Sequence, residues 1–356
     1  MGEVVDQAVE VRTGEELNQA TLEPFLRDQL KLPDGEFSVT QFPGGHSNLT
    51  YLVKIGNTEM VLRRPPFGSK VKSAHDMNRE FSILSKLSPV YSPAPEPLLF
   101  CDNQDIIGCD FYVMERLKGM ILRTTKPEGY APSEHAVTGT CIAMANNLAD
   151  LHTVDWRSIG LEALQKKEGS FMQRQVEGWT KRYAGSKTHD LPLVDQVFQW
   201  CNEHIPDDSG AVLIHNDYKF DNVILNPEDS SDIIGVLDWE MSTIGDPLFD
   251  LGVALGYWVN PDEPDGISTT QCVIYKEPGS ISRQQFAEIY GERTGFDVSN
   301  MNYYYVFAMI KLAVVLQQIY YRYHHGLTTD ERFSGLIHGV KLLAERSAVF
   351  IDRGDF

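Results

Sequence analysis

The apolar positions of the chain follow two different periods, one before and one after about residue 117. Alternating apolar and polar residues predict strands at 37–42, 51–55 and 60–63, and two more at 97–102 and 111–114. After residue 133 the apolar positions recur at spacings of three and four, which is the period of a helix with one buried face. The pattern therefore predicts an α+β fold, with a small antiparallel β-sheet first and a mainly helical region after it.

The predicted helices fall mostly in the second region. Two lie early in the chain, at 15–30 and 73–87, on either side of the first three strands. The later ones span 133–152, 248–259, 282–295, 302–323 and 329–350. We expect two lobes, with residues 1–116 forming an N-terminal lobe and residues 117–356 forming a helical C-terminal lobe.

A polar cluster interrupts the apolar runs in the middle of the second region. The β-rich run 212–214 ends at His215-Asn216-Asp217, a second run begins with Asn222, and a third delivers Asp238. Turn residues at 226–229 predict that the last two runs form a hairpin, which brings two carboxylates and an amide to one edge. Phosphoryl transfer uses such a set, because it needs an oriented hydroxyl and a Mg²⁺ ion held against nucleotide phosphates.

The spacing of these residues also identifies a family. The sequence His215-Asn216-Asp217-Tyr218-Lys219-Phe220-Asp221-Asn222, followed later by Asp238-Trp239, has the spacing of a kinase catalytic loop and its metal-binding aspartate. Together with the run from Gly245 to Leu251, it resembles the aminoglycoside phosphotransferase and choline-kinase-like family. Protein kinases would have Phe-Gly after Asp238, and this chain does not. The closest likeness is to the kinase-like domain that some proteins carry fused to an acyl-CoA dehydrogenase, and to its stand-alone bacterial relatives. The resemblance implies a bilobal protein-kinase-like fold that uses ATP and Mg²⁺.

The polar cluster supplies the candidate chemistry of such an enzyme. Asp217 would accept or orient the proton of a substrate hydroxyl, and Asn222 and Asp238 would hold the metal. Asp221 is an alternative metal-facing carboxylate, although strand alternation directs it away from Asn222. Supporting roles, in bracing the loop or approaching the transferred phosphate, are expected for His215, Lys219 and Asp250.

The N-terminal lobe would hold the nucleotide. The resemblance implies that the Gly-rich turn after the first strand covers the phosphates with backbone N–H groups. The third strand carries Arg63 where the family usually has lysine; arginine keeps its charge and offers a bidentate fork. Glu80, on the following helix, is the expected ion-pair partner of Arg63. The expected nucleotide-binding residues are Gly44, Gly45, Ser47, Asn48, Arg63, Glu80, Glu115 and Leu117, the last two in a hinge whose backbone meets adenine.

The acceptor site is indicated by a local reversal of charge. Between residues 166 and 187 there are six basic residues against two acidic ones, in a chain with a formal charge of −19. A solvated helix face would explain this segment, and so would a site for the phosphates of coenzyme A. The resemblance also favours a hydroxyacyl-CoA acceptor, such as a 4-hydroxyacyl-CoA, over an aminoglycoside, choline or another small alcohol. Candidate substrate-side residues are Arg174, Lys181, Arg182 and Trp258.

The overall composition narrows the function classes further. A charge of −19 argues against nucleic acid as a partner, because nucleic-acid binders need a basic face. Five scattered cysteines indicate neither a disulfide framework nor a zinc site. Without a signal sequence or a long apolar stretch, we expect no membrane partner and a cytoplasmic location. The sequence leaves the oligomeric state open.

Two other classes of function compete with the kinase hypothesis. A non-catalytic nucleotide-binding pseudokinase is supported by Arg63 in place of lysine, but Asp217, Asn222 and Asp238 are all present. Metal-dependent hydrolysis would need more clustered histidine or carboxylate ligands than the catalytic loop provides.

Overall fold

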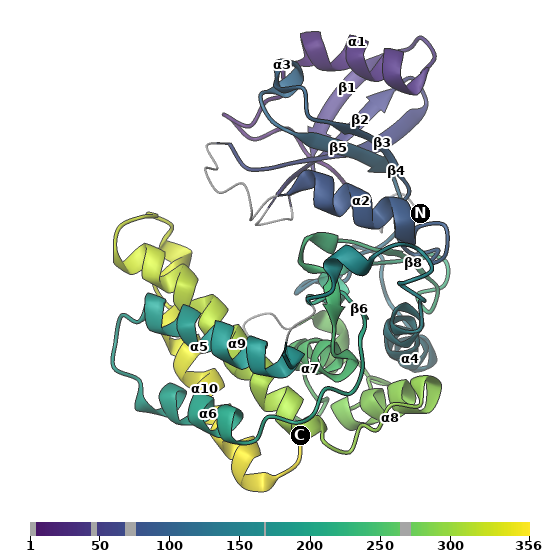
Figure 1. Cartoon of the computed structure of the whole chain (residues 1–356). Helices are drawn as coiled ribbons and strands as arrows, with labels where there is room; N and C mark the ends of the chain where they lie inside the picture. The colour runs from purple at the N-terminus through teal and green to yellow at the C-terminus, as the bar shows by residue number, and fades with distance from the viewer. Residues whose placement is uncertain (1–4, 44–47, 68–75, 167–168, 264–271) are drawn as a thin grey trace.

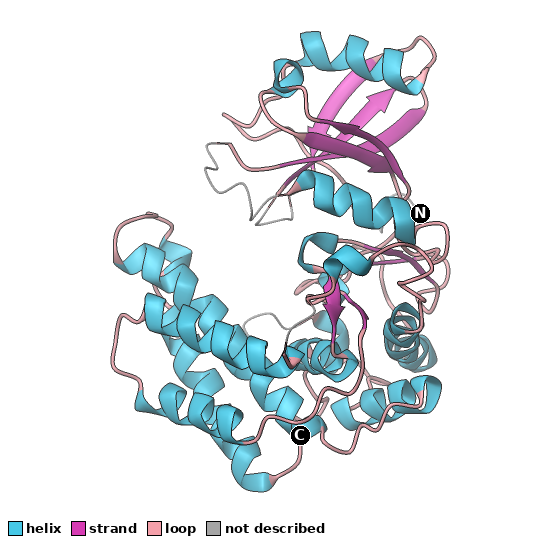
Figure 2. Cartoon of the chain, in the orientation of Figure 1, coloured by secondary structure: helices cyan, strands magenta, loops and turns pink. Residues whose placement is uncertain are grey.

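A computed structural model provides the structure and describes residues 5–43, 48–67, 76–166, 169–263 and 272–356. The chain forms a β-sheet lobe and a larger helical lobe (Figure 1). Most of the strands lie in the first lobe and most of the helices in the second (Figure 2). The predicted α+β class is therefore confirmed. The division of the lobes between residues 116 and 117 stays a prediction.

The N-terminal lobe is built on a five-stranded antiparallel sheet with the strand order β1-β2-β3-β5-β4. Its strands are β1 (Phe37–Gln41), β2 (Leu49–Ile55), β3 (Thr58–Arg64), β4 (Pro97–Cys101) and β5 (Phe111–Glu115). Helices α1 (Gln19–Leu30) and α3 (Gln104–Ile107) pack on one face through Leu22, Leu26 and Ile107. Helix α2 (Met77–Leu87) covers the other face.

The alternation of side chains along β3 determines which of its residues points toward α2 and the candidate active site. Met60 and Leu62 belong to the apolar core beneath α1, whereas Val61 packs with the residues of α2 on the opposite face. Because side chains alternate along a strand, Arg63 shares the face of Val61 and points toward α2. Arg64 points away, over the ring of Phe67 at 3.6 Å.

The C-terminal lobe surrounds four short strands with helices. The helices are α4 (Glu134–His152), α5 (Phe171–Ser186), α6 (Pro192–Glu203), α7 (Pro247–Tyr257), α8 (Arg283–Thr294), α9 (Met301–His324) and α10 (Leu336–Arg353). The strands are β6 (Val212–Ile214), β7 (Val223–Leu225), β8 (Ile233–Val236) and β9 (Thr243–Gly245). Strand β6 pairs with β9, and β7 pairs with β8 in the predicted hairpin.

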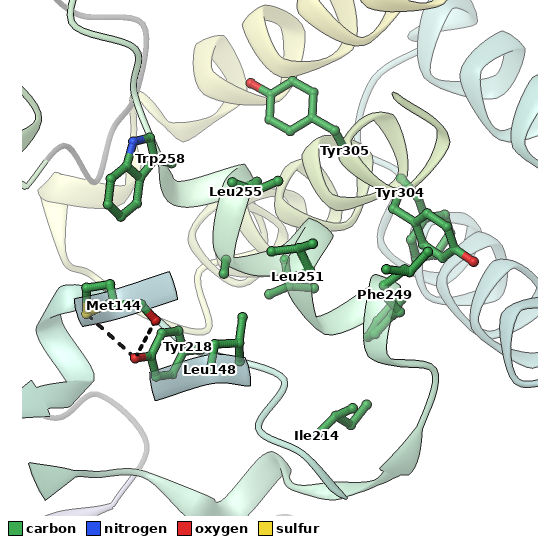
Figure 3. Close-up of a cluster of buried hydrophobic side chains, with 14 of the residues drawn as sticks. Met144, Leu148, Ile214, Tyr218, Phe249, Leu251, Leu255, Trp258, Tyr304 and Tyr305 are labelled. Atoms are coloured by element: carbon green, nitrogen blue, oxygen red, sulfur yellow. Dashed lines mark hydrogen bonds between the residues drawn. The ribbon is translucent and has the colours of Figure 1, made fainter. Parts of the chain in front are cut away.

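Apolar side chains from α4, α7 and α9 fill the space beside these strands. Figure 3 shows Met144 and Leu148 of α4 near Tyr218, with Leu251 and Leu255 of α7 close by. These side chains are buried, and they form a firm base for the catalytic loop that carries Tyr218. By burial alone such a cluster is worth several kcal/mol, at about 1.5–3 kcal/mol for each large side chain.

Two predicted helix starts are wrong, and one strand was not predicted. Helix α1 begins at Gln19 instead of residue 15, because the Glu15 carbonyl accepts a hydrogen bond from the Tyr51 hydroxyl at 2.7 Å. Helix α10 begins at Leu336 instead of residue 329, after a separate 3₁₀ turn that Asp330 caps. Strand β9 was not predicted, because it has only three residues, which pair with β6. A strand this short has almost no recognisable alternation of apolar and polar residues. The start of the predicted helix at 73–75 lies outside the described residues.

Candidate active site

The catalytic loop runs from β6 to β7 and is fixed from below by Tyr218. The Tyr218 hydroxyl donates to the Met144 carbonyl at 3.1 Å (Figure 3). It is also 3.0 Å from Asn147 Oδ1. Tyr91, in the segment between α2 and β4, donates to the same Asn147 oxygen at 2.7 Å. Buried hydroxyls need such partners, and these two hold the loop against α4.

Asp250 braces the loop from behind, as its place at the start of α7 led us to expect. Its carboxylate accepts the backbone N–H groups of His215 and Asn216, each at 2.7 Å. It also meets His152 Nε2 at 3.1 Å. Burial disfavours the charge of Asp250, but the hydrogen bond with His152 and the electrostatic interactions with His152 and His215 outweigh burial and lower the pKa of the carboxyl. These contacts support Asn216 in a left-handed conformation, with φ of 71°.

His215 connects the catalytic loop to the end of β8. Its Nε2 lies 2.8 Å from the Leu237 carbonyl oxygen, and its Nδ1 accepts the Asp217 backbone N–H at 3.3 Å. The ring nitrogen next to the carbonyl oxygen, Nε2, must donate, and the other ring nitrogen, Nδ1, accepts. His215 therefore holds the segments of Asp217 and Asp238 together.

The Asp217 carboxylate is held by three other side chains. Tyr257, at the end of α7, donates to Oδ1 at 2.8 Å. Lys219 Nζ lies 2.9–3.0 Å from both oxygens, and Asn222 Nδ2 donates to Oδ2 at 3.0 Å. Burial and the nearby Asp217 raise the pKa of Tyr257 well above its usual value, so this hydroxyl stays protonated and donates. The arrangement fixes the direction of an accessible carboxylate whose side chain is 22% exposed.

Asp238 and Asn222 lie on adjacent segments of the β7–β8 hairpin. The Leu237 N–H donates to the Asn222 carbonyl at 2.8 Å, which places Asp238 beside Asn222. Asp238 has a left-handed backbone with φ of 70°, unusual for a residue with a side chain. Because Asn222 Nδ2 is committed to Asp217, its amide oxygen is the atom left for a cation.

Arg63 spans the two lobes between Glu80 and Asp238. Its Nη2 lies 2.8 Å from Asp238 Oδ1 and 3.5 Å from Glu80 Oε1, so the expected ion pair with Glu80 forms. Burial works against all three charges. Arg63 nevertheless lowers the pKa of Asp238, whereas burial dominates at Glu80 and raises the pKa of that carboxyl. Arg63 Nε is buried without a hydrogen-bond partner among the described residues, and a phosphate oxygen would supply one.

The residues present fit a metal bound jointly with a nucleotide. The described part of the chain has no group of three or more histidine, cysteine or carboxylate residues able to hold a metal ion alone. Mg²⁺ commonly takes one or two carboxylates and completes its shell with waters and substrate phosphates. Asp238 and Asn222 offer a set of that kind.

Some of the remaining residues predicted to bind nucleotide lie in the described part of the chain, and others lie outside it. Gly44, Gly45 and Ser47 lie outside them. Asn48 donates to Glu240 Oε2 at 2.7 Å and so joins the end of the turn to the metal-side segment. The Glu115 side chain accepts a hydrogen bond from the Glu96 backbone N–H at 2.8 Å. Leu117 packs closely on Gly235, because a Cβ added at Gly235 would lie 2.7 Å from Leu117 Cδ1. The hinge is thus packed against β8.

Comparison with known proteins agrees with this geometry. Residues 38–271 match the family model described as the phosphotransferase enzyme family. The chain belongs to this family. The resemblance inferred from the catalytic-loop spacing is therefore confirmed.

Two relatives place this phosphotransferase within the family. It is 34% identical over 350 residues to rat acyl-CoA dehydrogenase family member 11, covering 96% of this chain and 44% of the relative. The chain therefore spans less than half the length of that curated relative. A solved structure of a Ralstonia eutropha protein, provisionally named as an aminoglycoside phosphotransferase, is 28% identical, with a TM-score of 0.79 and coverage of 95% and 99%.

More distant structures show the fold alone. Choline kinase from Cryptosporidium parvum has a TM-score of 0.66 at 13% identity, covering 95% of this chain and 97% of that one. The GDP and kanamycin complex of APH(2")-IIia has a TM-score of 0.59 at 16% identity, covering 92% and 98%. Both support the bilobal kinase-like architecture. No helix of the phosphotransferase is long and apolar enough to cross a membrane within the residues described.

The predicted acceptor-side residues of the phosphotransferase occupy different environments. Lys181 is exposed on α5, and the guanidinium of Arg182 lies 4.6 Å from the ring centre of Trp179. Arg174 donates to the Gly169 carbonyl at 2.5 Å, next to its own helix. Trp258 is only 3% exposed and donates to the Ile281 carbonyl at 2.9 Å, so the structure places it in the core.

Sequence reasoning missed two residues that approach the catalytic loop. Tyr257 was passed over beside Trp258, although a tyrosine at the end of an apolar helix is well placed to reach a polar loop. Lys311 Nζ donates to the Asn216 carbonyl at 3.2 Å. The signal for Lys311 was present, because it is the one charged residue between 301 and 320. Asp221, the alternative metal ligand, is half-buried, and burial raises the pKa of its carboxyl.

Proposed function

We propose that this phosphotransferase is an ATP- and Mg²⁺-dependent kinase that phosphorylates the hydroxyl group of a small molecule. The observation that carries the proposal is the Asp217 carboxylate, held by hydrogen bonds from Tyr257 and from Asn222, the residue that the segment of Asp238 contacts. A carboxylate oriented in this way can receive a hydroxyl group, and orientation is most of what phosphoryl transfer needs from a protein.

In this mechanism the substrate hydroxyl donates a hydrogen bond to Asp217. Its oxygen forms a bond to the γ-phosphorus as the bond to the leaving β-phosphate oxygen breaks, and its proton passes to Asp217. Lys219 Nζ, which lies 2.9 Å from Asp217 Oδ2, would stabilise the negative charge that develops on the transferred phosphoryl group. Arg63 would bind the nucleotide phosphates, which would give its unpartnered Nε an acceptor. Mg²⁺ held by Asn222 and Asp238 would neutralise phosphate charge.

A hydroxyacyl-CoA, such as a 4-hydroxyacyl-CoA, is the proposed acceptor. One support is the likeness to a protein named acyl-CoA dehydrogenase family member 11, although the chain spans 44% of that protein. The other is the excess of basic residues at 166–187, which suits the phosphates of coenzyme A and opposes polycationic aminoglycosides or choline. Phosphorylation would turn a poor leaving group on the acyl chain into a good one.

One observation favours a second candidate, a pseudokinase that binds nucleotide without catalysis. The Arg63 guanidinium lies 2.8 Å from the carboxylate that would hold the metal. If Arg63 stays there when nucleotide binds, Mg²⁺ cannot use that oxygen.

The test compares Asp217→Asn with the wild-type protein and with Asp207→Asn, a control at an exposed loop position. ADP release and product mass would be measured with ATP, Mg²⁺ and a panel of hydroxyacyl-CoAs, choline and aminoglycosides. We expect Asp217→Asn to lose about 10²–10⁴-fold in kcat, the range for one proton-transfer group, without a change in melting temperature. Transfer at near wild-type rate by Asp217→Asn would rule out its role as the base. If wild-type protein phosphorylates none of the panel yet binds ATP, the pseudokinase is the better description.

A further inference from the structure

Lys311 is a buried cation in a place where packing alone would favour an apolar residue. It is 9% exposed on α9, with the rings of Phe249 and Trp179 centred 5.3 and 5.7 Å from its Nζ. A lysine ammonium has three hydrogens to donate. Of the residues that the structure describes, the Asn216 carbonyl, at 3.2 Å, is the sole hydrogen-bond acceptor for it. The remaining donor capacity is unexplained by the protein itself.

The charged groups facing Lys311 come from three elements. Asp217 and Lys219 lie on the catalytic loop, Asp250 on α7 and Arg182 on α5. Both carboxylates are already engaged, Asp217 by Lys219 and Asp250 by His152 and the loop N–H groups. Burial is the largest effect on Lys311 and lowers its pKa to about 8, although the two carboxylates oppose this.

The result is a positive surplus on one side of Asp217. Lys219 is matched by Asp217, but Lys311 has no carboxylate of its own, and Arg182 rests on Trp179 without a carboxylate partner in the described part of the chain. Charges act strongly at such a site because burial reduces screening by water. A cationic acceptor entering beside Asp217 would be repelled, and an electron-rich oxygen would be attracted.

We propose that Lys311 is a specificity residue for the acceptor. Its buried charge, extended by Arg182 over Trp179, selects a hydroxy compound that presents an acyl oxygen and excludes cationic alcohols such as choline and aminoglycosides. The acyl oxygen is either the carboxylate of a free hydroxy acid or the carbonyl of a hydroxyacyl thioester. This role rests on the proposed kinase function and assigns its acceptor preference to one side chain. Exclusion of the wrong substrate by like charge is a common means of specificity.

The experiment compares wild-type protein with Lys311→Met, Lys311→Arg and the control Lys341→Met, at an exposed position on α10. Rates would be measured with a hydroxyacyl-CoA, the matching free hydroxy acid, choline and an aminoglycoside. For Lys311→Met we expect kcat/KM with the acyl acceptor to fall roughly 10- to 100-fold, the effect of losing one hydrogen bond to a charged group. The loss should come from the acceptor KM, while the ATP KM and the rates with cationic alcohols do not fall. Lys311→Arg should keep the preference for acyl acceptors over cationic alcohols. Comparison of the hydroxyacyl-CoA with the free hydroxy acid shows whether Lys311 binds a thioester carbonyl oxygen or a carboxylate oxygen.

Two further readouts separate specificity from a structural role. The melting temperature of Lys311→Met should be unchanged or higher, because a buried charge is replaced by an apolar side chain of similar length. The wild-type preference for acyl acceptors should weaken as pH rises through about 8, where Lys311 loses its proton, and this pH dependence should be absent in Lys311→Met. A lower melting temperature with an equal loss of kcat for every acceptor would make Lys311 a structural residue instead.

Binding distinguishes failure of this inference from failure of the kinase hypothesis. Calorimetric titration of the acyl acceptors into protein with ADP needs no phosphoryl transfer. One outcome is that no acceptor is phosphorylated, but acyl compounds bind to wild-type protein and not to Lys311→Met. That outcome contradicts the kinase function and supports the acyl-oxygen site. If transfer occurs and Lys311→Met binds both classes of acceptor as wild-type protein does, the specificity role is wrong.

Discussion

Arg63 lies between two carboxylates on the proposed nucleotide side of Asp217, whereas Lys311, on the proposed acceptor side, meets a single carbonyl oxygen among the described residues. We use the name paired region for Arg63, Glu80 and Asp238 together with Asp250 and His152 behind the catalytic loop. The second group, Lys311 and Arg182, is the acceptor-side cations. In the paired region each charged group already has a protein partner, although Arg63 Nε still lacks a hydrogen-bond acceptor among the described residues. The acceptor-side cations form no ion pair with a carboxylate in the described part of the chain, and we propose that an electron-rich group of the acceptor compensates them.

This difference leads to opposite expectations for mutation. Removing one member of a buried pair leaves the other charge without compensation, which typically costs about 3–5 kcal/mol of stability. Removing an unmatched cation costs little stability and affects function instead. The predictions that follow are ordered by the expected change in the free energy of unfolding.

Asp250→Ala should give the largest loss of stability. The substitution leaves two backbone N–H groups and His152 without their acceptor in a fully buried site. We expect a loss near the upper end of about 3–5 kcal/mol in urea unfolding, together with loss of phosphoryl transfer. Asp262→Ala, at an exposed position, is the control and should change stability by less than about 0.5 kcal/mol. An Asp250→Ala protein as stable as this control would contradict the bracing role.

Arg63→Met should lose about 3 kcal/mol at pH 7, because Glu80 remains buried without its cation. Glu80 can escape part of this cost by protonation, since burial already raises its pKa and loss of Arg63 raises it further. A carboxyl whose pKa is raised on folding stabilises the protein below its unfolded pKa, and this stability is lost as pH rises through the folded pKa. The difference between Arg63→Met and wild-type protein should therefore shrink as pH is lowered from 7 toward 5.

Urea unfolding at the two pH values measures this change, with Arg63→Lys as the matched variant that keeps a charge. If the stability difference is the same at both pH values, Glu80 does not titrate and the pair with Arg63 is not the cause. Arg63→Lys should lose less stability than Arg63→Met, because it keeps a positive charge between Glu80 and Asp238.

The catalytic loop and the Arg63–Glu80 pair are the parts of the site that the sequence could predict. Asp217, Asn222 and Asp238 lie at fixed spacings around one hairpin, so local structure is enough to bring them together. The alternation of β3 likewise fixes the face on which Arg63 meets Glu80. Local patterns also predicted most of the helices and strands. They did not predict helices α3 and α6 or strand β9, and they placed the start of α10 too early, before the local 3₁₀ turn that Asp330 caps.

The sequence marks Tyr257 and Lys311 as unusual positions but does not show that they contact the catalytic loop, because those contacts depend on how α7 packs on α9. A Cβ at Gly252 would lie 2.8 Å from the Tyr304 carbonyl, and one at Gly256 would lie 3.1 Å from Ala308. The two glycines, one helical turn apart, therefore allow α7 and α9 to approach closely. That approach brings Lys311 of α9 to the loop that α7 braces. Helical period alone predicts a buried face but not its partner.

Arg182→Gln tests the acceptor-side cations and should have the smallest effect on stability. Arg182 is exposed, and its contact is with the face of Trp179, 4.6 Å from the ring centre. An exposed cation over an aromatic ring contributes about 0.5–1 kcal/mol, and glutamine can retain part of the packing. We therefore expect the free energy of unfolding to fall by no more than about 1 kcal/mol.

The functional effect of Arg182→Gln should be larger than its structural effect. We expect the KM for an acyl acceptor to rise a few-fold, with the ATP KM unchanged, because one cation near the acceptor is removed while Lys311 remains. Steady-state kinetics at low and high salt would measure this, since an exposed charge is screened as ionic strength rises. The wild-type and variant KM values should therefore converge at high salt. If Arg182→Gln instead destabilised the protein as much as Arg63→Met, the acceptor-side cations would belong to the paired region and the contrast between the two sides of Asp217 would be lost.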